Sequence, residues 1–227
     1  REKVVSHDEL TIDIGATSKE EAQKRVKVGD YVIFETRYAL LDQGHMAKGK
    51  AFDDRAGCAV LAEMLKAGPY PFDLYGVFTV QEEVGLRGAR VAAYAVEPDA
   101  AIALEGTVCD DFPKERDVSP TTRLGDGPAI SIMDRSVISD RRLVDLLVDT
   151  AKENDIPYQF KQPGVGGTDS GAIHLAKTGV PTTVLSVPAR YIHSPVCLLS
   201  LSDFDYTVKL LKLALPKLAS LALKEEA

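Results

Sequence analysis

Residues 74–89 read LYGVFTVQEEVGLRGA. The first seven have the apolar pattern of a buried strand, and this strand runs directly into two adjacent carboxylates, Glu82 and Glu83. Neighbouring carboxylates are costly to bury unless a cation pairs with them. The partner is either Arg87, four residues after Glu83, or a metal ion. The rest of the chain has to decide between the two.

From residue 51 onward, strand-like and helix-like segments alternate. This alternation implies an α/β fold, with a mixed, mostly parallel sheet and helices on both faces. The helix pattern is strongest over residues 141–154, and Pro216 should interrupt the final helix. The expected strands are 74–80, 100–104, 129–133, 158–160 and 182–187, and the expected helices are 54–66, 86–94, 141–154, 171–177 and 202–223.

The first 50 residues or so have a different texture. They contain short β-like runs at 10–14 and 31–36 and a brief helical pattern at 18–25. Ser18 and Glu21 have the spacing of a capping box for that helix. A small β-rich unit is therefore expected before the α/β domain.

The bulk composition excludes several classes of function. The net charge is −7 and no basic patch is evident, which argues against a nucleic acid or an anionic membrane as a partner. No apolar run reaches the ~20 residues that a membrane span needs, and no signal-peptide pattern opens the chain. The cysteines Cys58, Cys109 and Cys197 lie far apart, as in proteins of a reducing compartment. The chain is therefore expected to be cytoplasmic.

Polar residues follow the predicted strands or open a predicted helix at four places. Ligands of open α/β sheets bind where strands end, and carboxylate and imidazole groups suit zinc, cobalt or manganese. Taken singly, each group has an ordinary structural explanation: a helix cap, an ion pair with Arg87, a solvated turn or a loop histidine. Their convergence favours a metal site instead. The four groups are Asp53–Asp54, Glu82–Glu83, Glu105 and His193.

The two glutamates can divide the chemistry between them. Neighbouring side chains at a strand end diverge, so one carboxylate can ligate a metal while the other faces the water. A metal lowers the pKa of its water towards ~7, and a carboxylate nearby can accept the released proton. This division predicts a metal-assisted hydrolase.

Residues 166–171, GGTDSG, do not form a phosphate-binding loop, because the lysine of that motif is absent. Ser170 also has no nucleophile-elbow context. We expect a loop that shapes the substrate pocket, in which Asp169 orients a neighbour.

Taken together, the chain resembles the glutamyl aminopeptidase and tetrahedral aminopeptidase family of dinuclear metallopeptidases, some members of which are named endoglucanase or cellulase. The resemblance covers nearly the whole chain. It rests on the segments Ile12–Ala16, Glu20–Ala22, Ala51–Gly57, Gln81–Ala89, Leu104–Gly106, Gly167–Asp169 and Arg190–Pro195.

The resemblance implies a role for each site residue. Asp53 bridges two divalent metal ions, zinc or cobalt, and Glu82 is the general acid/base. Glu83 and His193 complete one metal site, and Glu105 serves the other. Substrate or supporting contacts are expected from Asp54, Gly167, Thr168, Asp169, Arg190 and Tyr191. Residues 1–48 correspond to the C-terminal part of a β-rich inserted assembly domain, and residues 49–227 to the catalytic domain.

One family ligand has no counterpart here. The family's second metal site also uses a histidine from an N-terminal His-x-Asp-Glu segment. His7-Asp8-Glu9 is interpreted as a surface turn, and neither His45 nor His174 is a good substitute. We therefore expect the chain to lack an N-terminal portion of the catalytic domain and to hold one metal ion or none.

The resulting expectation is a metal-dependent aminopeptidase that acts on short peptides. By resemblance, it self-associates into a homo-oligomer, a dodecamer. One alternative is a glycoside hydrolase of the endoglucanase type, which leaves Asp53 and His193 without a role. The other is a catalytically impaired assembly subunit, which the absent histidine favours.

Overall fold

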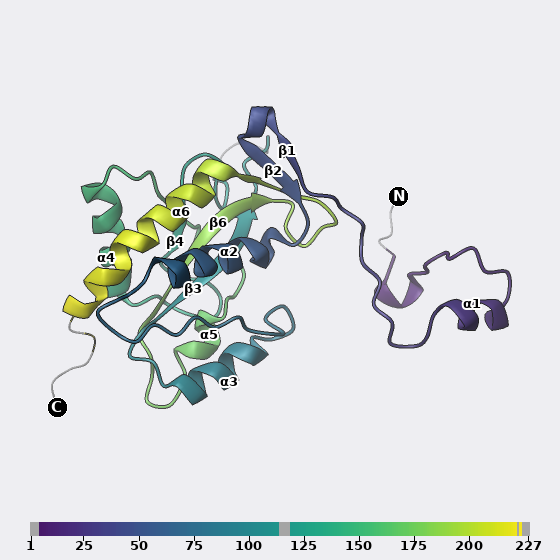
Figure 1. Cartoon of the computed structure of the whole chain (residues 1–227), viewed down its shortest axis with the longest axis horizontal. Coiled ribbons are helices and arrows are strands. Elements are labelled where there is room, and N and C mark those ends of the chain that lie inside the picture. The colour runs from purple at the N-terminus through teal and green to yellow at the C-terminus, as the bar shows by residue number, and fades with distance from the viewer. Residues whose placement is uncertain (1–4, 114–118, 222, 224–227) are drawn as a thin grey trace. The chain divides into compact units, whose positions relative to one another are not determined.

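The computed structural model describes residues 5–113, 119–221 and 223. The chain divides into two compact units, Arg1–Glu35 and Thr36–Ala227 (Figure 1). This division places the segment after Glu35 with the second unit. The assignment of residues 1–48 to an inserted assembly domain stays a prediction.

The described part of the first unit, residues 5–35, contains two short helices, η1 (His7–Glu9) and α1 (Lys19–Arg25). Ser18 caps α1, because its hydroxyl accepts a hydrogen bond from the N–H of Glu21 at 3.1 Å. The predicted strands at 10–14 and 31–36 are wrong, since the described part of this region contains no strand. A strand needs a hydrogen-bonded neighbour, and neither run has one here.

The second unit is built on a seven-stranded mixed sheet. The order is β1-β2-β7-β6-β4-β5, and β3 lies on the other side of β6. Pairing is parallel between β3 and β6 and between β4 and β5, and antiparallel elsewhere. The strands are β1 (Ala39–Leu41), β2 (Met46–Gly49), β3 (Ala101–Cys109), β4 (Ala129–Ser131), β5 (Gln159–Phe160), β6 (Thr182–Arg190) and β7 (Cys197–Ser200).

The helices form two groups around this sheet. In one group, α2 (Phe52–Ala67) and α4 (Arg141–Glu153) both pack against α6 (Leu201–Ala214). In the other, α3 (Arg87–Val96) packs against α5 (Ser170–Ile173), which also contacts β3 and β6. Short 3-10 turns, η2 (Asp42–Gly44) and η3 (Leu215–Ser220), complete the unit. The predicted α/β architecture with a mixed sheet is thus confirmed. The expectation that this sheet is mostly parallel is wrong for the described strands, because four of their six pairings are antiparallel, three of them made by the short strands β1, β2 and β7.

The main core lies between the sheet and the first helix group. Its fully buried side chains come from α2, α4, α6 and the central strands, and include Val60, Met64, Leu147, Leu185 and Leu210. The helix pattern predicted over residues 141–154 is confirmed, and α4 buries Leu143, Leu147 and Ala151. This packing fixes the ends of β2 and β3, where the polar residues of interest lie.

Two expectations about elements of this unit are wrong. Residues 74–80 form no strand, and most of their large side chains are exposed. The helix expected at 171–177 ends as α5 at Ile173. The expected interruption of the final helix by Pro216 is confirmed: α6 gives way after Ala214 to a 3-10 turn that contains Pro216, since proline has no N–H for the helical ladder.

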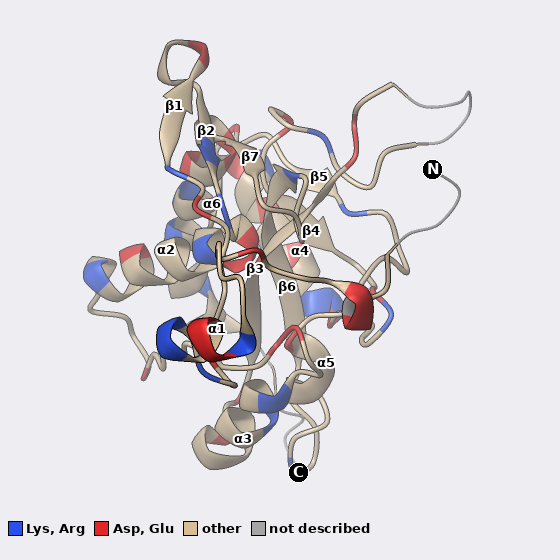
Figure 2. Ribbon diagram, turned by 90° about the vertical axis from the view of Figure 1, so that its right-hand side faces the viewer, with Lys and Arg blue, Asp and Glu red and all other residues tan. Residues whose placement is uncertain are grey.

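The distribution of charged residues and the hydropathy of the described helices agree with what the composition led us to expect. Lys and Arg are interspersed with Asp and Glu over the elements seen in Figure 2, and that view has no continuous basic face. No described helix is long and apolar enough to cross a membrane.

Candidate metal and catalytic site

Asp53 and Asp54 lie at the start of α2, directly after β2. Ala51 has φ +53°, and neither aspartate has helical backbone angles, so their carboxylates do not take the regular side-chain positions of a helix. Asp54 Oδ1 accepts a hydrogen bond from the N–H of Gly57 at 2.9 Å. A Cβ at Gly57 would lie 2.5 Å from that same carboxylate, so the glycine makes room for it.

Glu82 and Glu83 follow residue Gln81, which has φ +60°. The carbonyl of Glu82 accepts hydrogen bonds from Gly85 and Leu86 N–H at 3.0 and 2.9 Å, which fixes the turn. Arg87 donates to Gln81 Oε1 at 3.2 Å. Among the described residues, Arg87 forms no ion pair with either glutamate, which leaves a metal ion as the remaining candidate partner.

His193 comes from the connection between β6 and β7. It has φ +58°, and Tyr191 before it has φ +61°. Left-handed angles are rare outside glycine and cluster at functional sites. The turn places His193 Nε2 3.1 Å from Asp53 Oδ2 and 3.2 Å from Glu83 Oε2. Residues 140 positions apart in the sequence are therefore in contact.

These side chains form two groups with metal-ligand chemistry. Asp53, Glu83 and His193 each offer a ligand atom, and these atoms all lie within 4.8 Å of one another. The same holds for Asp53, Asp54 and Glu105. Asp53 belongs to both groups, so it stands between two candidate cation positions.

The carboxyl groups of this cluster have raised pKa values. Burial, followed by the charges of Asp169, Glu83 and Asp53, raises the pKa of Glu82 to about 7. Burial and Asp54 raise the pKa of Glu105 to about 9. The pKa of Asp54 rises to about 8, chiefly through burial. Carboxyl groups whose pKa values are raised by burial and mutual repulsion are not fully compensated by the positive charges around them. Their oxygen atoms and the imidazole of His193 fit a divalent cation.

The comparisons with known proteins agree with this chemistry. A family model described as M42 glutamyl aminopeptidase matches residues 1–210. The chain belongs to this M42 family. A putative aminopeptidase from Acetivibrio thermocellus is 46% identical over 203 residues, which are 89% of this chain and 60% of that protein.

Solved structures of M42 enzymes share the fold. The TET aminopeptidase of Thaumarchaeota archaeon SCGC AB-539-E09 superposes with a TM-score of 0.89 at 41% identity, over 96% of this chain and 62% of that one. The TET1 peptidase of Pyrococcus horikoshii, described as assembling into a tetrahedron or a large octahedral shell, gives 0.74 at 37% identity, over 89% of this chain and 59% of that one. The chain thus spans about 60% of the length of these M42 relatives.

Of the residues expected to contact substrate, Asp169 lies beside the carboxylate cluster. Its N–H is 3.4 Å from Glu105 Oε1, and its Oδ2 accepts a hydrogen bond from Thr79 at 2.6 Å. Asp169 is therefore in contact with Glu105, and its expected role in orienting a neighbour stays a prediction. Its other oxygen, Oδ1, is buried without a hydrogen-bond partner in the described structure.

Other residues of that set have structural partners outside the cluster. Arg190 forms a double hydrogen bond with Asp111, at 2.6 and 2.9 Å. The ring of Tyr191 stacks on that of Phe112. Thr168 donates to Asp134 at 2.9 Å, and the neighbouring Gly167 packs near Ser136. Their expected contacts with substrate stay predictions.

Two features were not assigned from the sequence. Asp54 was expected only in a supporting role, yet it lies within ligand distance of Asp53 and Glu105. Lys161, just after β5, is 5% exposed. Burial lowers the pKa of its ammonium group, whereas Asp134, Glu105 and Asp53 raise it. A single lysine in a polar stretch gives no sequence signal of such burial.

Proposed function

We propose that the M42 protein represented by this chain is a metal-dependent aminopeptidase that removes N-terminal residues from short peptides. The observation that carries the proposal is the double membership of Asp53 in two ligand groups. A carboxylate shared by two groups is suited to bridging two cations. Family membership supplies the reaction class.

The ligand roles follow from the two groups. Asp53 bridges, Glu83 and His193 complete one site, and Glu105 serves the other with Asp54 beside it. Zinc and cobalt are the proposed ions, since both accept carboxylate and imidazole ligands. When bound, such ions supply Lewis-acid polarisation of a carbonyl and a lowered pKa for water.

Glu82 is the proposed general acid/base. It is half-buried beside Asp53, Glu83 and Asp169, and it lines the same cavity as those residues. Its carboxylate takes a proton from the attacking water and returns it to the leaving amine, so that its charge is restored in each cycle. Asp169 and Thr79 hold the neighbouring Glu105 in place.

The setting of the enzyme is proposed by analogy. The related TET1 peptidase forms large shells, and we propose a homo-oligomer, a dodecamer, for the protein represented here. The three free cysteines agree with a cytoplasmic location. Nothing in the geometry favours a glycoside hydrolase, because two carboxylates suffice for that reaction and the contact of His193 with Asp53 would have no role.

The test compares hydrolysis of free and N-acetylated aminoacyl p-nitroanilides with added zinc or cobalt. Only the free substrates should be cleaved. Glu82→Gln should retain its metal, measured by elemental analysis, and lose about 10²- to 10⁴-fold in kcat. Near-normal turnover by this variant would refute the general-base role. Metal binding without hydrolysis of any substrate would favour an assembly subunit.

For the 227-residue chain itself we expect one bound metal ion or none. The group of Asp53, Asp54 and Glu105 contains no imidazole, which weakens its selectivity for zinc. Two ions per chain at full occupancy would contradict this expectation.

A further inference from the structure

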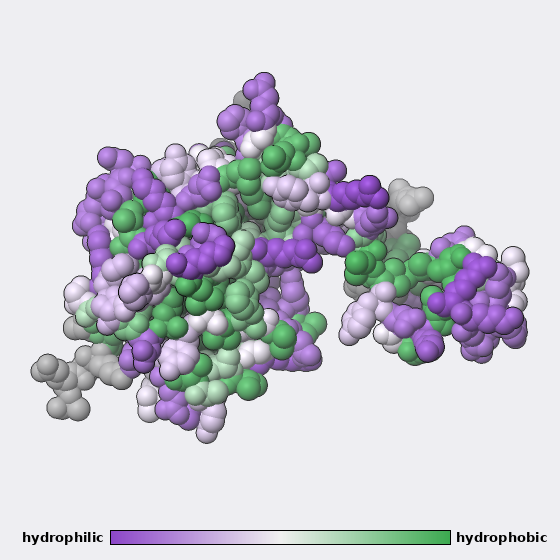
Figure 3. All heavy atoms as spheres, in the orientation of Figure 1, coloured by the Kyte–Doolittle hydropathy of each residue, from purple (hydrophilic) through white to green (hydrophobic). Residues whose placement is uncertain are grey.

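Lys161 is a buried lysine that the proposed reaction does not use. In Figure 3 hydrophilic side chains gather at the periphery of the second unit, where lysines ordinarily lie. Lys161 is instead 5% exposed. Among the described residues it forms no ion pair and no side-chain hydrogen bond. Burying an ammonium group without a direct partner is unfavourable, so the position of this lysine calls for an explanation.

The strand register places Lys161 on the same face of the sheet as Glu105. Glu105 of β3 pairs with Ser186 of β6. Ser186 pairs with Ala129 of β4, and Ala129 pairs with Gln159 of β5. Paired residues share a face, and so do residues two apart on one strand. Lys161 follows Gln159 by two residues, and its N–H continues the ladder to β4 at 3.1 Å. Only the short side chains of Ser186 and Ala129 separate Glu105 from β5 on this row.

The charge of Lys161 is coupled to one of the two ligand groups. Burial lowers the pKa of its ammonium group, and three carboxylates raise it, among them Glu105 and Asp53. The effect is mutual, because burial raises the pKa of Asp53 and Lys161 is among the groups that lower it. Glu83, which belongs to the other ligand group, is not among the groups that act on Lys161. The coupling is therefore to the group of Asp53, Asp54 and Glu105.

The third carboxylate, Asp134, forms no direct pair with Lys161. Its Oδ1 accepts hydrogen bonds from the N–H groups of Ser136 and Val137 at 2.6 and 3.0 Å. Its Oδ2 accepts a hydrogen bond from Thr168 at 2.9 Å. These donors already stabilise the negative charge of Asp134. The positive charge of Lys161 can therefore act through space on the ligand group.

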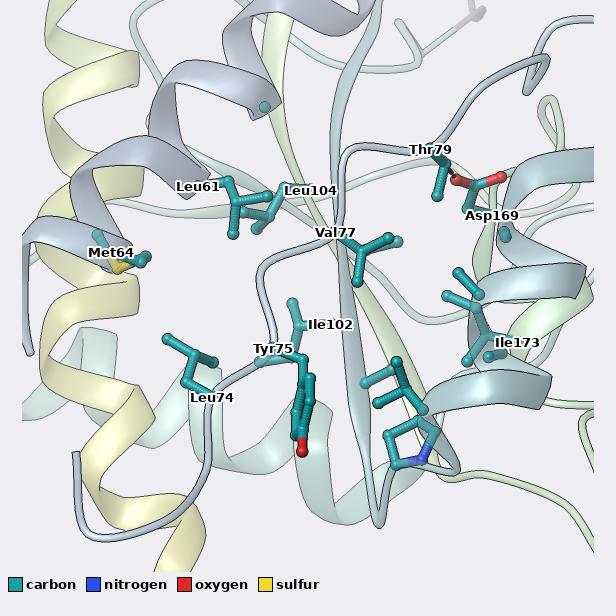
Figure 4. A pocket seen from close by; sticks show the side chains of 18 of the residues that line it. Leu61, Met64, Leu74, Tyr75, Val77, Thr79, Ile102, Leu104, Asp169 and Ile173 are labelled. Atoms are coloured by element: carbon teal, nitrogen blue, oxygen red, sulfur yellow. Dashed lines mark hydrogen bonds between the residues drawn. The ribbon is translucent and has the colours of Figure 1, made fainter. Parts of the chain in front are cut away.

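The surroundings of Lys161 exclude two roles. It is not a metal ligand, because an ammonium group has three donors and no acceptor. It also does not line the cavity that contains Glu82 together with Thr79 and Asp169, which are joined by a hydrogen bond in Figure 4. A substrate held there would not touch it. What is left is repulsion, since a fixed positive charge competes with a bound cation for the same carboxylates. Buried charges interact strongly because water and salt screen them little.

We propose that Lys161 is a built-in positive charge that weakens cation binding to the group of Asp53, Asp54 and Glu105. It touches neither the ion nor the substrate and acts only through its field. An ion held by this group is the more exchangeable of the two, because the coupling to Lys161 does not extend to Glu83. The inference rests on the metal centre of the proposed function and adds a residue that sets its affinity.

The test measures the affinity of the intact chain for two ions of different charge, Mn²⁺ and Tb³⁺, which both accept carboxylate oxygens. Terbium is followed by its luminescence and manganese by water-proton relaxation. Lys161→Met keeps an unbranched side chain and removes the charge, and Lys161→Gln removes it with a polar side chain. Each variant should gain about tenfold or more in affinity for Tb³⁺ and less for Mn²⁺, since the repulsion grows with the charge of the ion. One folded variant, checked by circular dichroism, is sufficient.

Lys66→Met is the matched control. It removes the same charge by the same substitution from α2, where the Lys66 side chain is 72% exposed and pairs with Glu63. Its affinity for either ion should stay within about twofold of the parent's, because exposed charges are screened by water and salt.

Four results would overturn the proposal. Unchanged affinities in both Lys161 variants would show that the charge does not reach the ligand group, and would leave the proposed peptidase function intact. Equal gains for the two ions would indicate a change in packing rather than in charge. Weaker binding would make Lys161 a support of the site. If neither the parent nor any variant binds either ion, the metal centre itself is refuted, and the proposed function with it.

Discussion

Replacing Glu105 by glutamine should stabilise the metal-free protein at neutral pH. Glu105 is 7% exposed, and burial together with Asp54, Glu82, Asp53 and Asp169 raises its pKa from 4.5 to about 9. At pH 7 the folded protein therefore keeps a proton that the unfolded chain has released. Glutamine cannot ionise, yet its carbonyl can still accept the hydrogen bond from Asp169 N–H.

The magnitude follows from proton linkage. A carboxyl group with a raised folded pKa has no effect on stability below its unfolded pKa. Each pH unit between 4.5 and about 9 then costs about 1.4 kcal/mol. At pH 7 the cost amounts to about 3 kcal/mol, which Glu105→Gln removes. Bound metal should reverse the order, because ligands that bind only the native state stabilise it.

The assay is urea unfolding in EDTA at pH 4.5, 7 and 8.5, repeated with zinc or cobalt. Asp145→Asn is the control, since Asp145 pairs with Arg141 on the exposed side of α4. The free energy of unfolding should diverge between Glu105→Gln and the unmodified chain as pH rises, and only in EDTA. Parallel pH profiles for the two proteins would refute the claim that Glu105 is buried among like charges.

The remaining predictions concern the ligands and one supporting ion pair. His193→Ala should lower zinc or cobalt content in elemental analysis, whereas His45→Ala should leave it unchanged; equal losses would contradict the ligand role. Gly57→Ala should weaken metal affinity in a cobalt titration at least tenfold, since a Cβ there would lie 2.5 Å from Asp54 Oδ1; unchanged affinity would remove Asp54 from the site. Asp111→Asn should cost about 2 kcal/mol at pH 7, because hydrogen bonds from Arg190 outweigh burial and lower the pKa of Asp111 from 3.8 to about 2. That contribution is present above pH 3.8 and lost as pH falls to about 2, so thermal melts of variant and parent should converge at the acid end; a constant difference down to pH 2 would contradict it.

Much of the architecture follows from local patterns in the sequence. The helices at α2, α3 and α4 and the strands at β3 and β6 carry strong apolar periodicity, and all five were predicted within a few residues. β1, β2 and β7 were not predicted. Their existence depends on partners far away in the chain, such as the pairing of β2 with β7.

Residues 74–80 show the limit of local patterns most clearly. Their sequence predicts a buried strand, and the described structure gives them neither a partner strand nor burial. An apolar pattern indicates that a segment is stabilised by burial. Whether the segment is in fact buried depends on the elements that lie beside it. In residues 74–80 the sequence pattern and the described structure disagree.

The residues of the candidate site could be predicted from the sequence more completely than their division into two ligand groups. Asp53, Glu82, Glu83, Glu105 and His193 were all predicted, and the structure brings the four proposed ligands among them together around Asp53. The place of Asp54 in a ligand group was not predicted, since the sequence gives no sign that both aspartates have non-helical backbone angles. Backbone angles at Ala51 and in the following residues decide that point.

The most direct test of a metal centre shared through Asp53 is a cobalt titration of Asp53→Asn, followed by its visible absorption spectrum. Asp53 belongs to both ligand groups, so its replacement should abolish cobalt binding to the chain, whereas Asp145→Asn should bind as the parent does. Cobalt binding by Asp53→Asn with the affinity and spectrum of the parent would contradict the shared centre.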